Sequence, residues 1–304
     1  MNGVINLDKP TGISSNGVLT RLKRLIGESK MGFVGTLDPM AQGVLPVFVG
    51  KATKLIPNFE GHDKEYRVTL RLGERTDTFD TDGNLIERRD ASHLDEARVR
   101  EAILAFQGEI IQVAPAYSAV KHNGVPAYRL ARQGKPVPEK RRRVRLCNMV
   151  VERVDLPEVT FRVACTPGTY MRSLGEEIGK RLEVGAAVSR LIRLRCGNVF
   201  RLENSVAMEA IQEAADKDDF AFVINPSDIL VDHHPYTVGG AEERSLRIGR
   251  VLPLADGCAP PNLLEGPDPP RIKAIRPGGT LVAVGVVVRT REGGWGMQPT
   301  KVLV

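Results

Sequence analysis

The segment Lys64–Leu72 constrains the fold more than any other stretch of the chain. Its apolar residues Tyr66, Val68, Leu70 and Leu72 alternate with polar and charged residues. Successive side chains of a β-strand point to opposite faces, so this pattern predicts a strand with one buried and one solvated face. Such half-buried strands are typical of antiparallel sheets, and Tyr66 lies near the beginning of this one.

Other segments predict a mixture of strands and helices. Short apolar runs bounded by Gly or Pro indicate strands, and apolar residues at helical spacing behind capping residues such as Ser14 or Ser92 indicate helices. A Pro-Gly turn begins another helix near Tyr170, and Ala187–Phe200 indicates a helical turn followed by a strand. The predicted strands are 4–7, 44–49, 64–72, 147–154 and 159–165, and the predicted helices begin near residues 15, 53, 92, 170 and 204.

The composition of the chain changes near residue 234. Pro and Gly become dense between Pro253 and Gly279, and β-rich runs follow at 281–288 and 301–304. A chain of 304 residues exceeds the common size of one domain. We therefore expect a large domain over residues 1–234 and a small β-rich domain over residues 235–304.

The net charge favours an anionic partner. Lys and Arg number 43 against 37 acidic residues, and the isoelectric point is near 9.2, as is common for proteins that bind nucleic acid. The four cysteines form no Cys-x-x-Cys pair and the five histidines show no metal-ligand spacing, so we expect neither a metal nor a cofactor. The sequence shows no signal peptide and no apolar run of about 18 residues. We therefore expect a cytoplasmic protein with no membrane partner.

A single carboxylate stands at the turn in Gly35–Pro46. Pro39 disfavours the helical conformation of Asp38, so the backbone aims this side chain. Taken alone, an Asp-Pro pair is more typical of a residue that stabilises a turn than of a catalytic group. Arg172 follows a strand-to-helix turn, where a guanidinium is placed to bind a carboxylate with two hydrogen bonds, and Asp38 is the candidate partner.

Three further segments carry charge or lack regular structure. Glu74–Asn84 contains Asp-x-Asp-Gly, but it lacks the other ligand positions of a calcium loop, so a turn is the favoured interpretation. Residues 113–138 are rich in Gly and Pro and predict a functional or mobile loop. Arg141–Arg145 is either a solvated strand or a rim that binds phosphates.

Five blocks of the chain, in order, resemble the TruB family of tRNA pseudouridine-55 synthases. One block is Lys30–Pro46 around Asp38, and the others lie at 4–16, 64–68, 115–132 and 168–174. The resemblance spans nearly the whole chain, and the tail is similar to the small PUA barrel that members of this family carry. It implies an α+β fold: a large mixed, mainly antiparallel sheet with flanking helices and a central RNA cleft, followed by a small β-barrel.

The resemblance also implies site residues and a reaction. Asp38 would be the nucleophile, which attacks C1′ or C6 of a uridine that has been flipped out of the RNA. A carboxylate is already a nucleophile at neutral pH, so the isomerisation needs no metal or cofactor. Tyr66 would stack on the flipped uracil, which must leave its helical stack to be reached. The other residues implied for the site are Arg172 as the partner of Asp38, Tyr170 and Leu191 as pocket lining, and Lys9 as support for the N-terminal loop.

Phe33 departs from the pattern of the family. Its members usually have His at this position, two residues before Gly35, and the resemblance implies that this His lies near the flipped nucleotide. Phe33 can stack on a base but cannot form the hydrogen bonds of an imidazole. We hypothesise that Phe33 acts as a stacking wedge during extrusion of the nucleotide.

The function implied is isomerisation of the uridine at position 55, in the T-loop of tRNA, to pseudouridine. The expected partner is tRNA, bound through its T-stem-loop by a monomer whose loop 113–138 contacts the RNA, and no DNA partner is expected. Two alternatives stay open: an RNA-binding chaperone of tRNA folding with weak catalysis, and a guide-RNA-dependent pseudouridine synthase subunit. The block at 115–132 favours the stand-alone type of enzyme over the guide-RNA-dependent one.

Overall fold

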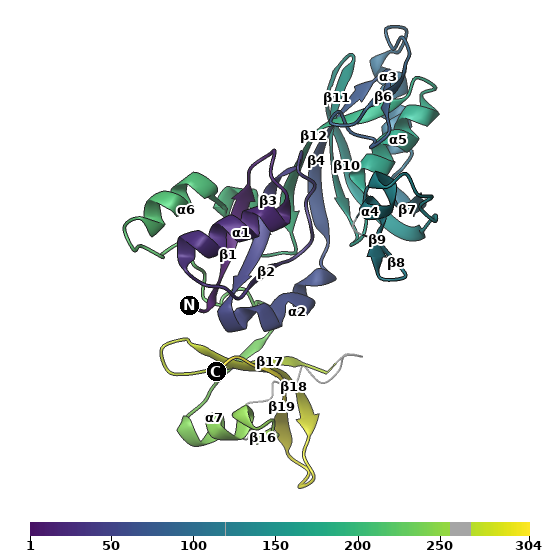
Figure 1. Ribbon diagram of the computed structural model, residues 1–304. Helices are drawn as coiled ribbons and strands as arrows, with labels where there is room; N and C mark the ends of the chain where they lie inside the picture. The colour runs from purple at the N-terminus through teal and green to yellow at the C-terminus, as the bar shows by residue number, and fades with distance from the viewer. Residues whose placement is uncertain (119, 256–268) are drawn as a thin grey trace.

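The computed structural model describes residues 1–118, 120–255 and 269–304 (Figure 1). Its largest part is a ten-stranded sheet in which β1 and β14, and β3 and β12, are parallel neighbours, while the other neighbours are antiparallel. The prediction of a large mixed, mainly antiparallel sheet is therefore confirmed. In spatial order the strands are β14 (Val206–Ala207), β1 (Gly3–Lys9), β3 (Gln42–Val49), β12 (Ala186–Cys196), β4 (Lys64–Leu72), β11 (Glu158–Cys165), β10 (Arg141–Asp155) and β7 (Gly108–Val113), with β2 (Met31–Phe33) beside β3 and β13 (Phe200–Arg201) beside β12.

Helices pack against this sheet, and their ends follow local chemistry. The hydroxyl of Ser14 accepts a hydrogen bond from the N–H of Gly17, and the first helix ends at Gly27, which has φ +69°. The predicted capping role of Ser92 is wrong, because Asp95 caps the third helix by accepting from the N–H of Arg98. The helices of this part are α1 (Ser15–Ile26), α2 (Ile56–Glu60), α3 (Glu96–Leu104), α4 (Ala127–Arg132), α5 (Met171–Arg181) and α6 (Met208–Ala215), with 3-10 turns at Gly50–Leu55 and Leu202–Asn204.

The helical turn predicted near Ala187 is absent, because β12 is a strand along its whole length. It pairs with β4 on one side and β3 on the other, so its backbone groups are used in the sheet. Register shifts at Val188–Arg190 and Arg193–Arg195 interrupt its alternation, so its sequence does not show the regular period of a strand. At Gly43 of β3 a side chain would have its Cβ 2.3 Å from the carbonyl oxygen of Arg193, so only glycine permits this close approach.

The predicted loops contain more regular structure than expected. Residues 113–138 include the hairpin β8 (Lys121–His122) and β9 (Val125–Pro126) and then α4. The acidic segment lies in a second hairpin, between β5 (Glu74–Thr76) and β6 (Leu85–Arg88). The carboxylate of Asp77 accepts from the backbone and the amide of Asn84, as a turn residue does.

Two hydrophobic cores hold the large sheet in place. In the first, buried residues of α1, α3 and α5, among them Leu22, Ile103 and Leu174, pack against the strands. Burying one such side chain contributes about 1.5–3 kcal/mol. In the second, the rings of Phe48 and Phe59 lie 5.4 Å apart, and the same cluster includes buried residues from the C-terminal part of the chain.

The C-terminal part forms a separate five-stranded sheet, which lies beside α2 in Figure 1. The composition change near residue 234 coincides with the beginning of its first strand. Its strands, in spatial order, are β15 (His234–Thr237), β17 (Arg271–Ile275), β18 (Leu281–Arg289), β19 (Trp295–Val302) and β16 (Leu252–Pro253), with the helix α7 (Gly240–Arg247). Among the described strands no pairing closes β15 onto β16, so the expected small barrel is seen here as an open sheet. In the described ranges no helix has the length and apolar character needed to cross a membrane.

Candidate active site

Asp38 lies in the turn between β2 and β3, at the edge of the first core. Its side chain is 39% exposed, whereas Leu37 and Ala41 on either side are buried. The N–H of Ala41 donates to the carbonyl of Asp38 at 3.1 Å and closes the turn. The sequence pattern of a polar turn between apolar neighbours thus leaves one carboxylate accessible on an otherwise buried loop.

Two side chains from the N-terminal segment hold this loop. The Ser15 hydroxyl donates to the carbonyl of Leu37 and accepts from its N–H, both at 2.9 Å. The ammonium of Lys9, which is fully buried, donates to the carbonyls of Pro10 at 2.8 Å and Ala41 at 2.6 Å. Burial lowers the pKa of Lys9 to about 8, and the charge of Asp38 opposes this shift. Lys9 therefore joins the N-terminal loop to the Asp38 loop.

Arg193 joins the same loop to the strand that carries Tyr66. Its Nε donates to the carbonyl of Val44 at 2.6 Å and its Nη2 to the carbonyl of Gly35 at 3.0 Å, so it binds both arms of the Asp38 loop. Arg193 faces Tyr66 across β12 and β4, and only 1% of it is exposed. Burial raises the pKa of Tyr66 to about 12, and the nearby charge of Arg193 lowers it in part.

Arg172, at the beginning of α5, lies against Asp38. The distance from its Nε to Oδ2 of Asp38 is 2.8 Å, so the structure brings the two predicted partners together. The two-bond pairing that we expected is absent, because Nη1 donates to the carbonyl of Thr78 at 3.0 Å and Nη2 to that of Tyr117 at 2.8 Å. The Nε–H is not aligned with the carboxylate, so this contact is an ion pair rather than a directed hydrogen bond.

Asp80 forms the far side of an arrangement of two carboxylates around one guanidinium. Its Oδ2 lies 3.6 Å from Nη1 of Arg172, and both side chains are at least 90% buried. The pKa of Asp80 lies above its ordinary value because the carboxylate is buried. A hydrogen bond from the Thr78 hydroxyl and the charge of Arg172 oppose this shift. Arg172 therefore has a fixed acidic neighbour on its buried side and a more accessible one, Asp38, on the other.

The start of α5 is fixed by the neighbouring strand β7. The amide of Gln112 donates to the carbonyl of Tyr170 and accepts from its N–H, and the Ser173 hydroxyl donates to the carbonyl of Val113. These bonds on either side of Arg172 determine where its guanidinium lies. Tyr170 itself is half-buried and, in the described part of the chain, makes no hydrogen bond to Asp38.

The remaining predicted residues belong to the same core. Tyr66, which is 8% exposed, and Leu191, which is 5% exposed, lie in the cluster that contains Leu37 from the Asp38 loop. Phe33 is partly buried and packs against this cluster from β2, opposite Val47. The structure thus gathers these side chains around one core without showing a hydrogen bond or ion pair from them to Asp38.

Two charged residues of the site were not predicted. Arg193 shares an inward face of β12 with Leu191, but the register shifts of this strand interrupt the alternation that would have identified it from the sequence. Asp80 lies in the segment 74–84, whose sequence predicts only a turn. No spacing in the sequence relates Asp80 to Arg172, since the contact depends on how the hairpin folds over α5.

Comparison with known proteins finds that the chain is similar to pseudouridine synthases. A family model described as "TruB family pseudouridylate synthase (N terminal domain)" matches residues 23–171. The tRNA pseudouridine synthase B of Geobacter sulfurreducens is 42% identical over 256 residues, which cover 83% of each chain. That of Burkholderia mallei is 42% identical over 267 residues, which cover 88% of this chain and 87% of the relative.

Solved structures share the fold. The chain superposes on a protein of an H/ACA RNP bound to a substrate RNA containing 2′-deoxyuridine with a TM-score of 0.70 and 23% identity, over 99% of this chain and 85% of that one. A Cbf5-Nop10-Gar1 complex gives a TM-score of 0.70 and 25% identity with the same coverage.

Proposed function

The chain belongs to the TruB family of pseudouridylate synthases, and we propose that it converts the uridine at position 55 of tRNA, in the T-loop, to pseudouridine with Asp38 as the nucleophile. The observation that carries this proposal is the half-exposed carboxylate of Asp38, held 2.8 Å from the buried guanidinium of Arg172. The chain is 42% identical to relatives named tRNA pseudouridine synthase B, against 23–25% for the proteins of the H/ACA RNP and the Cbf5-Nop10-Gar1 complex. This difference favours tRNA as the substrate.

In the proposed reaction the target uridine leaves its stack and enters the site. The Asp38 carboxylate attacks either C1′ of the ribose or C6 of the ring, and the bond between C1′ and N1 breaks. The uracil turns and rejoins C1′ through C5, and the bond between Asp38 and the substrate breaks, which restores the carboxylate. The proton on C5 leaves, and N1 gains a proton. Product and substrate have the same atoms and oxidation state, so the residues of this chain need only bind, orient and exchange protons.

Arg172 and Asp80 suit a carboxylate whose charge changes during the reaction. When Asp38 forms a covalent bond to the substrate, its negative charge is lost. Without another acidic partner, the guanidinium of Arg172 would then be a buried charge with no counter-charge, which is destabilising. Asp80 at 3.6 Å from Nη1 supplies that partner throughout. The two carbonyls that bind Arg172 also keep it from turning away, so Asp38 is oriented at each step.

Tyr66 is proposed to stack on the flipped uracil, and Leu191 and Tyr170 to line the same pocket. Stacking on an aromatic side chain contributes roughly 1–3 kcal/mol per base, which offsets part of the energy of unstacking. A phenol is neutral at pH 7, so the ring of Tyr66 presents no charge to the base. Arg193 lies opposite Tyr66 in the sheet and donates to the carbonyl of Gly35, so it fixes the position of the Asp38 loop relative to this ring.

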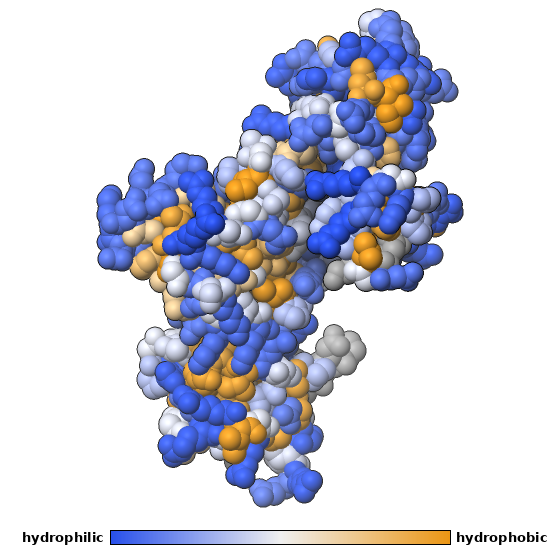
Figure 2. Space-filling model, viewed as in Figure 1, coloured by the Kyte–Doolittle hydropathy of each residue, from blue (hydrophilic) through white to orange (hydrophobic). Residues whose placement is uncertain are grey.

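The phosphates of the RNA are proposed to lie along basic residues at the edge of the sheet. Arg141 and Arg143 of β10 are 72% and 76% exposed. Arg141 pairs with Val113, whose carbonyl accepts from Ser173 beside Arg172, so this basic strand begins next to the site. Figure 2 shows hydrophilic side chains extending from the region of α4 toward the centre of the molecule. Arg21 and Arg24 on the outer face of α1 form a second basic surface.

We propose residues 1–234 as the catalytic domain and 235–304 as a PUA-like RNA-binding domain. The separate five-stranded sheet of the C-terminal part supports this division.

We propose that the segment 113–138 contacts the RNA, because the exposed Arg129 on α4 gives this segment a cation.

Binding of a T-stem-loop is expected to fall steeply with salt, and the basic strand should account for part of the slope. Replacing Arg141 and Arg143 by Ala should lower the slope of log affinity against log salt by about 1 to 2, because each lost phosphate contact removes about one released counterion. The matched control replaces Arg88 of β6 and Arg153 at the opposite end of β10, which are 70% and 73% exposed. Affinity that does not vary with salt, or an equal loss in both double variants, would contradict this assignment.

Phe33→Ala is expected to slow pseudouridine formation and to weaken RNA binding, each by roughly tenfold, because the variant loses one stacking contact with a base. Phe33 is partly buried, so part of its ring is free to meet a base. Phe106→Ala is the control, since it removes a partly buried ring from the same core at a distant helix end. Parent-like rate and affinity in Phe33→Ala would remove the wedge hypothesis.

The activity itself is tested by tritium release from RNA labelled at C5 of uridine. The isomerisation frees the hydrogen on C5, so the protein should release one tritium per molecule from the target uridine of tRNA and of an isolated T-stem-loop. A protein that binds both RNAs but releases no tritium would support the chaperone alternative instead.

A further inference from the structure

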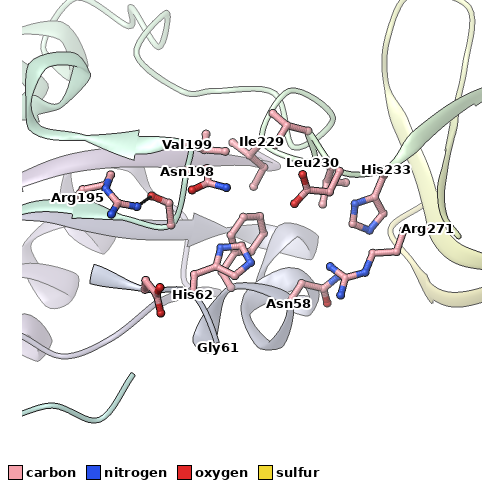
Figure 3. A pocket seen from close by; sticks show the side chains of 15 residues that line it. Asn58, Gly61, His62, Arg195, Asn198, Val199, Ile229, Leu230, His233 and Arg271 are labelled. Carbon is pink, nitrogen blue, oxygen red and sulfur yellow. Dashed lines mark hydrogen bonds between the residues drawn. The ribbon is translucent and has the colours of Figure 1, made fainter. Parts of the chain in front are cut away.

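A cavity of about 440 Å³ lies between the large sheet and the C-terminal sheet, and neither Asp38 nor Arg172 lines it (Figure 3). Its lining comes from the end of α2 and the following turn, the end of β12, the connector before β15, and Arg271 of β17. Pockets for small ligands usually measure about 300–1,000 Å³ and often lie at domain junctions. The size and place of this cavity are therefore those of a ligand site, distinct from the proposed reaction site.

One wall of the cavity is aromatic and apolar. The rings of Phe59 and His62 lie 5.2 Å apart, edge to face, and Ile229 and Leu230 are buried beside them. A Cβ at Gly197 would lie 2.6 Å from Nδ1 of His62, so the absence of a side chain there lets the imidazole occupy this position. Such a wall can receive a planar heterocycle by stacking.

The polar groups of the cavity are largely unused by the protein. Within the described ranges, the amides of Asn58 and Asn198 make no side-chain hydrogen bond, and Nδ1 of His233 is buried without a partner. Burial lowers the pKa of His62, and it lowers that of His233 to about 4, so both rings are neutral at pH 7. Neutral imidazoles and amides each offer both a donor and an acceptor, as the edge of a nucleobase requires.

Two arginines reach the cavity, and only one is already paired. Arg195 binds Glu65 at 3.2 Å and the carbonyl of Gly197 at 2.9 Å. Arg271 is exposed and, among the described residues, forms no salt bridge and donates no side-chain hydrogen bond. In Figure 3 its guanidinium extends from the C-terminal ribbon toward the part of the pocket that Asn58 lines.

We propose that this cavity binds one nucleotide, with the base against His62 and the phosphate on Arg271. A guanidinium binds phosphate with two parallel hydrogen bonds, and the amides and neutral imidazoles suit a base edge. Asp63 and Asp232, which also line the cavity, can accept from ribose hydroxyls or exocyclic amino groups. The nucleotide is either an unpaired one of the RNA substrate or a free mononucleotide, and both sources present the same chemistry.

Equilibrium dialysis of the full-length protein against AMP, GMP, CMP, UMP and inorganic phosphate tests the site. At least one mononucleotide should bind at one saturable site and more tightly than phosphate, and Arg271→Glu should weaken it at least about tenfold, because a charge-assisted contact becomes a repulsion. Arg291→Glu is the matched control, since it reverses an exposed charge in the same small sheet unit. Asp38→Asn should bind the mononucleotide as the parent does, so this result is independent of the proposed reaction.

Steady-state kinetics separates the two sources, and this part rests on the proposed function. If the nucleotide belongs to the RNA, Arg271→Glu and Asn58→Leu should raise KM for full-length tRNA by about tenfold while KM for the isolated T-stem-loop stays unchanged. If it is a free mononucleotide, dialysis shows the loss and neither KM changes. The proposal is overturned if the variants change neither mononucleotide binding nor KM for tRNA, if phosphate binds as tightly as every mononucleotide, or if Arg291→Glu matches Arg271→Glu.

Discussion

Asp38→Asn is expected to abolish pseudouridine formation, with a fall in single-turnover rate on the order of 10⁴-fold or more, while the protein stays folded. The rate falls because an amide cannot replace the nucleophilic carboxylate, and loss of a nucleophile removes most of the catalytic advantage. The fold persists because the Asp38 side chain is 39% exposed and Arg172 keeps Asp80 and two carbonyls as partners. Tritium release from labelled tRNA gives the rate, and thermal unfolding gives the stability.

Asp82→Asn is the control for this experiment. Asp82 is an exposed acid in the hairpin that carries Asp80, and its substitution removes one negative charge near the site without touching Asp38. It should release tritium at nearly the parent rate. A rate for Asp38→Asn within tenfold of the parent would show that another group attacks the uridine.

Arg172→Met is expected to combine a large loss of activity with a loss of stability. Removing the guanidinium leaves Asp80 buried with no cation, and breaking a buried ion pair from one side destabilises a protein by about 3–5 kcal/mol. Asp38 also loses the group that orients it, so we expect activity to fall by at least roughly 10²-fold. Urea unfolding and tritium release measure the two effects separately.

The double variant Arg172→Met with Asp80→Asn distinguishes orientation from folding. Replacing the buried carboxylate by a neutral amide removes the uncompensated charge, so the free energy of unfolding should recover a large part of the loss. Activity should not recover, because Asp38 still lacks its neighbour at 2.8 Å. Restored activity in the double variant would mean that Arg172 acts through stability alone.

Local patterns predicted much of the large sheet because each strand carries its own signal. The alternation of Lys64–Leu72 and the buried run of β3 predicted strands that the structure contains. The sequence of β12 does not predict a strand along its whole length because two register shifts break its period. Ser92 begins a capping-box pattern, but the cap is Asp95, another residue type that favours this position. Such choices depend on packing partners that lie far away in the sequence.

The site was predictable only where chemistry pointed to a partner. A carboxylate in a constrained turn and an arginine after a Pro-Gly turn were natural partners, and the structure brings Asp38 and Arg172 together. Asp80 and Arg193 complete the arrangement through contacts set by the register of the sheet and the fold of a hairpin. The roles of Asp80 and Arg193 stay predictions, as do those of Tyr66, Tyr170, Leu191 and Lys9. Substitution of each residue, followed by the tritium-release and unfolding measurements, can test them.

The most direct measurement of the central claim is chemical mapping of pseudouridine in an unmodified full-length tRNA after incubation with the parent protein and with Asp38→Asn. We predict one new pseudouridine per molecule, at position 55, with the parent and none with the variant. Absence of pseudouridine with the parent, pseudouridine at another position only, or undiminished formation by Asp38→Asn would contradict the account.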